Sequence, residues 1–331
     1  MLTHLRLVKH TLHWSLFVYF FSCSSVNASI AASITTPPGK QQLQQMFMDL
    51  TPQLEKNPYD APLYLQSNTH EKSAFGEIYA ILPYDYQTLT QELLQPGRWC
   101  RAMILHINIK GCVKPRDKNA IRTYLGYKTY QNLEESLVLE YAFQVIQHSH
   151  DYTHILLSSD FGPYGTSDYK LHAQIIPLPP EQGTATNRCF IHLSYSVQYG
   201  NLAMFVLNSY LATFGRNKVG FSINNDDDKD NGPPKFTGGM RGVVERNAMR
   251  YFLALQSYFG TLNLPEEERF KASLNQWFDF TEKYKQQLYE MERGEYLAFK
   301  LQEFANQTEM QQRIDHPPAY QSKPAPGIFD F

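Results

Sequence analysis

The chain has 331 residues, which is enough for one large domain or two modest ones with a substantial core. Its formal net charge is -2 and charged residues make up only 19%, so bulk charge favours neither nucleic acid nor an anionic membrane as a partner. Aromatic residues reach 14%, either because β-rich proteins are aromatic or because tyrosines line a cavity.

Residues 1–28 have the features of a signal peptide. Two basic residues and no acidic residue precede an apolar run at 15–21, which is too short to span a bilayer as a helix. Val26-Asn27-Ala28 then offers small residues at the positions that a signal peptidase reads, so we expect cleavage after Ala28. The expected location is the periplasm or the outside of the cell. An uncleaved membrane anchor and lipidation of Cys23 are the alternatives.

Three cysteines remain after such a cleavage, and an oxidising compartment permits one disulfide among them. Cys100 and Cys112 are close in sequence and are the first choice for the pair. A pair between Cys112 and Cys189, or three buried free thiols, are the alternatives. No cysteine spacing resembles a zinc site, and we expect neither a metal nor a cofactor.

Residues 29–72 are expected to form a leader with a short amphipathic helix at 41–54, followed by a polar, turn-rich stretch. A strand is predicted at 75–82. Asp85 is placed to cap the next helix, because its carboxylate can accept backbone N–H groups at the open helix end. That helix stops before Pro96, and a second turn holds Trp99 and Cys100.

A series of strands is predicted next. Apolar and polar residues alternate with a period of two, which predicts an antiparallel meander with one face buried and the other in water. The clear strands are 105–110, 137–145, 168–175 and 191–199, with weaker ones at 120–130 and 153–159.

Helices dominate the rest of the chain. The helical spacing predicts helices at 202–214 and 243–259, which flank an acidic hairpin at 219–237. A long helical pattern follows over 266–305, where Gly294 is a candidate break. Residues 306–331 are polar and proline-containing, and we expect a disordered tail.

The order of strand 75–82, helix 84–102, strands 104–199 and helix 201–215 resembles the helix-grip fold of the START-like (SRPBCC) ligand-binding superfamily. The expected fold is therefore α+β, a helix-grip-like curved antiparallel sheet packed on a long helix. The expected sheet and helix domain covers 73–240, with additional C-terminal helices at 241–305 packed on it.

Two stretches are also similar to segments of uncharacterised exported proteobacterial proteins. They are Gly-Arg-Trp-Cys-Arg-Ala-Met-Ile-Leu-His-Ile-Asn-Ile-Lys-Gly-Cys and Gly-Gly-Met-Arg-Gly-Val-Val-Glu-Arg-Asn-Ala-Met-Arg-Tyr-Phe. That similarity implies no known activity. The START-like resemblance implies a cavity between the sheet and a C-terminal helix for a lipid or another apolar ligand. Because the chain continues past helix 201–215, either that helix or 243–259 closes the sheet.

The predicted ligand-binding residues combine aromatic positions with two arginines that share one face of helix 243–259: Trp99, Tyr141, Tyr169, Tyr195, Arg246 and Arg250. A guanidinium group suits a carboxylate or phosphate headgroup. The alternative is a buried ion-pair network that joins this helix to the sheet. For Trp99, the alternative is a place in the core.

Catalytic signatures are weak, and no catalytic residue is predicted. The aspartate-rich run at 226–230 departs from a calcium loop and reads as a solvated hairpin tip. Four histidines on separate strands could bind a metal or transfer protons if two of them converge, but the place of three of them in the polar phase favours exposure. They are His106, His154, His172 and His192.

The leading hypothesis is an exported, non-enzymatic binder or carrier of a hydrophobic or lipid-like molecule. The second is a cell-envelope interaction protein that docks a partner through exposed Tyr284, Tyr289 and Tyr296 of the C-terminal helices. The third is a cyclase or aromatase-like enzyme of START-like fold. It requires polar side chains that converge inside the cavity, with His106, Asn108 and His192 as candidates.

Overall fold

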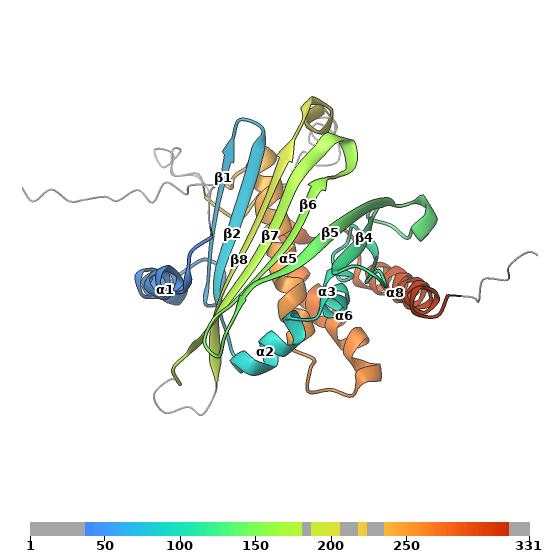
Figure 1. Cartoon of the computed structure of the whole chain (residues 1–331). Helices are drawn as coiled ribbons and strands as arrows, with labels where there is room; N and C mark the ends of the chain where they lie inside the picture. Colours follow the sequence, from blue (N-terminus) through green and yellow to red (C-terminus); the bar gives the residue numbers. More distant parts are fainter. Residues whose placement is uncertain (1–36, 181–186, 206–217, 224–234, 318–331) are drawn as a thin grey trace, which may run out of the picture. The chain divides into compact units, whose positions relative to one another are not determined.

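A computed structural model describes residues 37–180, 187–205, 218–223 and 235–317 (Figure 1). Its first part contains α1 (Lys40–Glu55), β1 (Leu63–His70), β2 (Ser73–Leu82), α2 (Tyr86–Leu93), α3 (Pro96–Met103), β3 (Ile109–Val113) and β4 (Ala120–Leu125). The chain continues with η1 (Leu133–Glu135), β5 (Leu137–His148), β6 (Thr153–Phe161), η2 (Pro163–Gly165), β7 (Thr166–Leu178) and β8 (Arg188–Tyr199). The last elements are α5 (Gly239–Phe259), α6 (Glu266–Lys283), α7 (Lys285–Leu288) and α8 (Arg293–Asp315).

In the described part of the chain, eight strands form one antiparallel sheet in the order β1-β2-β8-β7-β6-β5-β4-β3. From β3 to β8, each strand pairs with the next one in sequence. β2 then pairs with β8 over its whole length, from Ser73 opposite Gln198 to Leu82 opposite Cys189. This order confirms the α+β class and the predicted antiparallel meander, and Figure 1 shows the sheet with helices on it.

The helix that covers the sheet is α5, which corresponds to the predicted helix 243–259. It packs on β2, β1 and β8 and places Val244, Ala248 and Phe252 in the main core, at the spacing of one helix face. Gly76 on β2 allows a close approach, because a Cβ there would lie 3.3 Å from the Ala248 Cβ. Of the other candidate helix, only 201–205 is described, and it is helical.

The opposite face of the sheet is covered by α1. Successive residues of a strand point to opposite faces, so Ile78 joins the core under α5 while Tyr79 joins a second core with α1. Leu43 and Leu54 are the buried residues of α1. The predicted wet face is therefore partly dry, and this explains why polar residues on it are buried.

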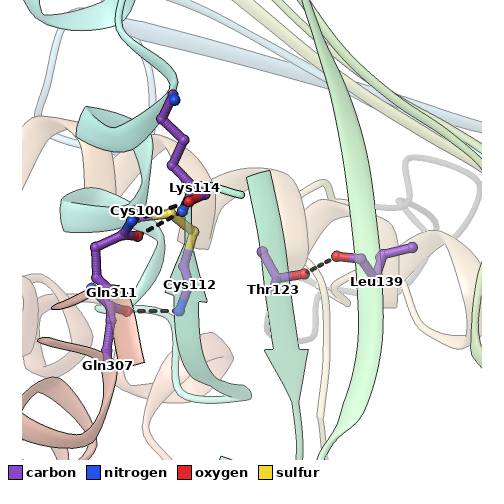
Figure 2. Close-up of a disulfide and its surroundings, with 7 residues drawn as sticks. All are labelled: Cys100, Cys112, Lys114, Thr123, Leu139, Gln307 and Gln311. Carbon is purple, nitrogen blue, oxygen red and sulfur yellow. Dashed lines mark hydrogen bonds between the residues drawn. A yellow bond between two sulfur atoms is a disulfide. The ribbon is translucent and has the colours of Figure 1, made fainter. Parts of the chain in front are cut away.

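The sheet has two edge strands, β1 and β3, and α8 covers the edge at β3. The Gln307 side-chain oxygen accepts the Cys112 backbone N–H at 2.7 Å, and Gln311 accepts the N–H of Lys114 at 2.8 Å (Figure 2). These glutamines satisfy edge groups that would otherwise be open to another chain. The expected disordered tail at 306–331 is therefore wrong for 306–315, which is helical because the sheet edge holds it.

A disulfide joins Cys100 of α3 to Cys112 of β3, which confirms the first-choice pair (Figure 2). Cys189 is a buried free thiol, and burial raises its pKa to about 12. Asp85 caps α2 as expected, since its carboxylate accepts the Thr88 backbone N–H at 3.0 Å.

Two strand assignments need correction. Residues 56–72 were expected to be turn-rich, but Leu63–His70 forms β1 and pairs with β2. Its alternation is visible only in buried Leu63 and Leu65, which are too few to stand out in the sequence. The predicted strand 105–110 begins only at Ile109, because backbone hydrogen bonds of the helical kind continue past α3 to His106.

The C-terminal helical pattern is divided into α6, α7 and α8, and the breaks fall at Tyr284 and over 289–292 instead of Gly294. All the described elements belong to one compact unit, so a domain boundary at residue 73 would separate β1 from its own sheet. The signal peptide, Cys23, most of helix 202–214 and the acidic hairpin tip lie outside the described residues.

Candidate functional site

A pocket of about 580 Å³ lies between the sheet and the first half of α5. Strands β5, β7 and β8 contribute side chains to it, as do the connections that follow α3 and β4. Met240, Val243, Asn247 and Tyr251 of α5 form the opposite wall. The pocket exists because α5 packs closely at β2 and leaves room where it passes the strands further along the sheet.

Four tyrosines from the sheet and from α5 line this pocket together, and we call them the tyrosine wall: Tyr141, Tyr169 and Tyr195 are buried strand residues, and Tyr251 of α5 is partly buried. Ring centroids are 6.3 Å apart between Tyr141 and Tyr169, 6.4 Å between Tyr169 and Tyr195, and 5.6 Å between Tyr195 and Tyr251. Burial raises the pKa of each phenol, so all four hydroxyls remain protonated at neutral pH. The wall thus offers aromatic faces and neutral hydroxyls to a ligand.

His106 is the buried histidine of the pocket. Its Nδ1 accepts the Asn108 backbone N–H at 3.1 Å, an arrangement that assigns the ring proton to Nε2. Burial holds the pKa of His106 well below its usual range, and the nearby positive charge of Arg250 adds to this effect. The neutral ring lies against Tyr251, with centroids 5.1 Å apart.

The proton on Nε2 has no well-aligned acceptor among the described residues. The Nε2 atom is buried, and no described residue makes a hydrogen bond to it. Asn247 lies near enough to oppose the lowering of the His106 pKa, but its geometry does not satisfy Nε2.

Charged groups are scarce around the pocket. Among the described lining residues there is one carboxylate, Glu135, and there is no lysine or arginine. An uncharged group would therefore fit this lining better than an ion, since a buried ion requires a partner charge.

Exposed apolar side chains mark the mouth of the pocket. Tyr127, Tyr164 and Leu137 all line it and are 74%, 49% and 41% exposed. Tyr164 has φ 57°, in the left-handed region that a non-glycine residue rarely adopts, and Gly165 follows with φ 73°. Such a backbone conformation is kept only where its surroundings impose it, so the η2 turn fixes the position of the Tyr164 ring.

Three of the predicted ligand-binding residues, Tyr141, Tyr169 and Tyr195, do line the pocket. Trp99 does not. It is buried under α3, where its Nε1–H donates to the Leu93 carbonyl at 2.8 Å, so the alternative of a core residue describes its place.

The two predicted arginines also lie outside the pocket lining. The Arg250 guanidinium donates to the Glu290 carboxylate at 2.9 Å, and Arg246 donates to the Val219 carbonyl at 3.0 Å. Glu290 is a shared partner, because Lys128 lies 2.8 Å from it as well. The alternative reading of the arginines as internal polar contacts therefore describes them, but the contacts join α5 to the segment after α7 and to Val219 instead of to the sheet.

The strand histidines converge, but on the face opposite to the pocket. His154 and His172 share a hydrogen bond of 2.9 Å, and His192 lies 2.7 Å from Gln174 and 3.1 Å from Glu77. The expectation of exposure is wrong for His106 and His192, which are 4% and 0% exposed, while His172 is half-buried. The alternation of polar and apolar residues along a strand predicts which face of the sheet a residue occupies. It does not predict whether a helix covers that face.

Tyr251 and Asn247 are the site residues that the sequence interpretation did not include. Their signal was present, because Val243, Asn247 and Tyr251 recur every four residues and therefore share one face of a helix. In the sequence, the charged side chains of Arg246 and Arg250 are the more obvious candidates for ligand binding. Only the structure shows which of the two helix faces turns toward the pocket.

Within the described ranges, no group of three or more His, Cys, Asp or Glu side chains is placed to hold a metal ion. Helices there are either too short or too polar to cross a bilayer.

No protein-family model matches the chain, and no curated protein matches it. Among solved structures, it is similar to CalU16 from Micromonospora echinospora, with a TM-score of 0.26 and 10% identity over 67% of this chain and 96% of that one. It is also similar to a truncated norcoclaurine synthase from Thalictrum flavum, with a TM-score of 0.28 and 12% identity over 45% of this chain and 90% of the synthase chain. A STAR-related lipid transfer protein fragment from Xanthomonas axonopodis gives a TM-score of 0.31 and 9% identity over 62% of this chain and 96% of that fragment. At these TM-scores, the functional argument depends on the pocket itself.

Proposed function

We propose that this protein binds or carries one small hydrophobic molecule in the pocket between the sheet and α5, without transforming it. The observation that carries the proposal is the tyrosine wall in a pocket of about 580 Å³. Ligand sites in proteins are concave, mostly apolar, and roughly 300–1,000 Å³ in volume, with a few polar groups that fix orientation. The pocket has these properties, and its uncharged lining favours an apolar cargo.

We also propose that the chain is a START-like protein that is exported to the periplasm or secreted. The strand order and the covering helix α5 support the first part. Residues 1–28 and the Cys100–Cys112 disulfide support the second, because structural disulfides are typical of oxidising compartments. Expression with the natural N-terminus, followed by fractionation and intact-mass measurement, tests this. A mature chain that begins at Ser29 is expected, and a full-length cytoplasmic chain would contradict export.

Binding can be tested with the neutral dye N-phenyl-1-naphthylamine, whose fluorescence rises in an apolar site. The wild-type protein is expected to bind it saturably. Val243→Trp places a large ring in the pocket and is expected to weaken binding roughly tenfold or more. Leu301→Trp is the matched control, because Leu301 is 44% exposed on α8 and does not line the pocket. Equal binding by the two variants would place the dye elsewhere and contradict the proposal.

Neither alternative function gains support from the side chains proposed for it. Tyr296, one of the predicted docking tyrosines, is completely buried and donates to the Leu105 carbonyl at 2.7 Å. Tyr284 donates to the Tyr59 carbonyl at 2.9 Å. The expected exposure is therefore wrong for Tyr296, which is fully buried, and Tyr284 and Tyr289 are half-buried. For the enzyme, His106 and Asn108 do line the pocket, but His192 is on the other face of the sheet.

A further inference from the structure

We propose that the molecule in this pocket is uncharged and flat and carries a carbonyl oxygen, and that the Tyr195 hydroxyl donates a hydrogen bond to that oxygen. The inference rests on the proposed function, because it names the chemical class of ligand for the same pocket.

The Tyr195 hydroxyl is unpaired within the protein. Tyr195 is only 7% exposed and lines the pocket, yet no described residue makes a hydrogen bond with its hydroxyl. Its neighbour in the tyrosine wall differs, since the Tyr169 hydroxyl donates to Thr166 Oγ1 at 2.7 Å. The hydroxyl opens into the pocket, so a molecule bound there can supply the hydrogen-bond partner that the protein does not.

A second unpaired donor lies on the other side of Tyr251. The Tyr251 ring contacts Tyr195 at a centroid distance of 5.6 Å and His106 at 5.1 Å. Because His106 Nδ1 already accepts a backbone N–H, its Nε2 can only donate. Two donors around one aromatic ring require an acceptor, and a carbonyl oxygen has two lone pairs to receive them.

Charges near this wall favour an oxygen acceptor but provide no direct counter-ion for an anion. Arg250 and Lys300 lie near enough to His106 to lower its pKa, so the electrostatic potential there is positive. Both cations are already paired, Arg250 with Glu290 at 2.9 Å and Lys300 with Glu303 at 2.9 Å. A carboxylate or phosphate ligand would lose its hydration without gaining a salt bridge.

The flat shape follows from the tyrosine wall. Rings prefer offset or edge-to-face contacts at centroid distances of about 4.5–7 Å, and a planar ligand can make such contacts with several tyrosines at once. A flexible acyl chain fills the same volume but loses more conformational freedom on binding.

The test compares three probes of nearly equal size: fluorene, its ketone 9-fluorenone, and fluorene-9-carboxylate. Affinities are measured by calorimetry or by quenching of protein fluorescence at neutral pH. Fluorenone is expected to bind roughly 5- to 10-fold more tightly than fluorene, as one buried hydrogen bond implies, and the carboxylate is expected to bind weakest.

Tyr195→Phe removes the hydroxyl and little else, so it is expected to bring fluorenone down to the affinity of fluorene without changing fluorene binding. Tyr64→Phe is the matched control, because the Tyr64 hydroxyl lies on the α1 side of the sheet near Gln66. His106→Phe is expected to reduce the preference for the ketone in part.

Each outcome decides something different. If fluorene and fluorenone bind equally well to the wild type, or if the carboxylate binds best, the ligand class is wrong while the hydrophobic pocket stands. If none of the probes binds, both the ligand class and the proposed function fail.

Discussion

The ammonium group of Lys300 lies 2.9 Å from the carboxylate of Glu303, one helical turn further along α8, and both side chains are completely buried. Lys110 of β3 reaches the same carboxylate at 3.0 Å. Lys300 also donates to the carbonyls of His106 and Ile109, at 2.9 and 2.7 Å. This cluster therefore fixes α8 to β3 and to the turn that carries the pocket histidine.

Removal of the shared carboxylate should destabilise the protein strongly. Glu303→Gln leaves two buried lysines without a counter-ion, and breaking a buried pair in this way costs about 3–5 kcal/mol. Urea denaturation at neutral pH measures the change in the free energy of unfolding. Glu309→Gln on the same helix is the control, since its pair with Arg313 is exposed and is worth less than about 1 kcal/mol. Similar losses of unfolding free energy in both variants would show that the buried cluster stabilises the protein no more than an exposed ion pair does.

Lys300 should make stability rise with pH above neutrality. Burial lowers its pKa from 10.5 to about 7, so between these values the unfolded chain binds a proton that the folded chain has released. The free energy of unfolding therefore increases across this window, by roughly 1–2 kcal/mol from about pH 7 to 8.5. Lys300→Met, which leaves Lys110 paired with Glu303, should flatten this rise. The thiol of Cys189 ionises at about pH 8.5–9 in the unfolded chain but not in the folded one, so the measurement is denaturation of Cys189→Ala proteins at several pH values below about 9, where the tyrosines remain protonated in both states.

The hydrogen-bonded pair of His154 and His172 should make the protein sensitive to mild acid. Burial lowers their pKa values from 6.5 to about 4 and about 3. Their contribution to stability is present above pH 6.5 and is lost as the pH falls toward these values, because only the unfolded chain then takes up the protons. Melting temperatures should fall between about pH 6.5 and 4.5, before buried carboxylates such as Glu77 are protonated.

His154→Gln combined with His172→Gln should reduce that acid sensitivity. His150→Gln is the control, because the His150 side chain is 90% exposed. An unchanged pH profile in the double variant would assign the acid sensitivity to other groups.

The disulfide should contribute stability mainly through the unfolded chain. Cys100 and Cys112 are separated by 12 positions, and closing a loop of this length stabilises a protein by about 2–3 kcal/mol. Cys100→Ser with Cys112→Ser should lower the free energy of unfolding by that amount. A reducing agent should have the same effect on the wild type and none on the double variant. An identical response of the two proteins to the reductant would contradict this assignment.

Several elements could be read from the sequence because their signals are local. Asp85 at the start of α2, the alternation in β7 and β8, and the short spacing between Cys100 and Cys112 each depend on neighbours in the chain. The three strand tyrosines of the wall were found for the same reason, since alternation along a strand determines which face they occupy.

Other predictions failed where a distant segment decides the outcome. The strand histidines carry a polar pattern, but α1 covers their face and buries His192 completely. Residues 306–315 are polar, yet Gln307 and Gln311 hold them against β3. Arg250 was predicted to meet a ligand and instead meets Glu290, which is 40 positions away.

By itself, the sequence determined the antiparallel meander that precedes α5, the covering helix as one of two candidates, the disulfide as the first choice among the possible pairs, and three of the four tyrosines in the wall. Hydrophobic period and short-range spacing encode these features directly. Only the tertiary structure decided that α5 covers the sheet, that its arginines turn to an internal carboxylate while Asn247 and Tyr251 face the pocket, and that His106 and Tyr195 retain unpaired donors. Those outcomes depend on which groups from distant parts of the chain meet, and no local pattern specifies that.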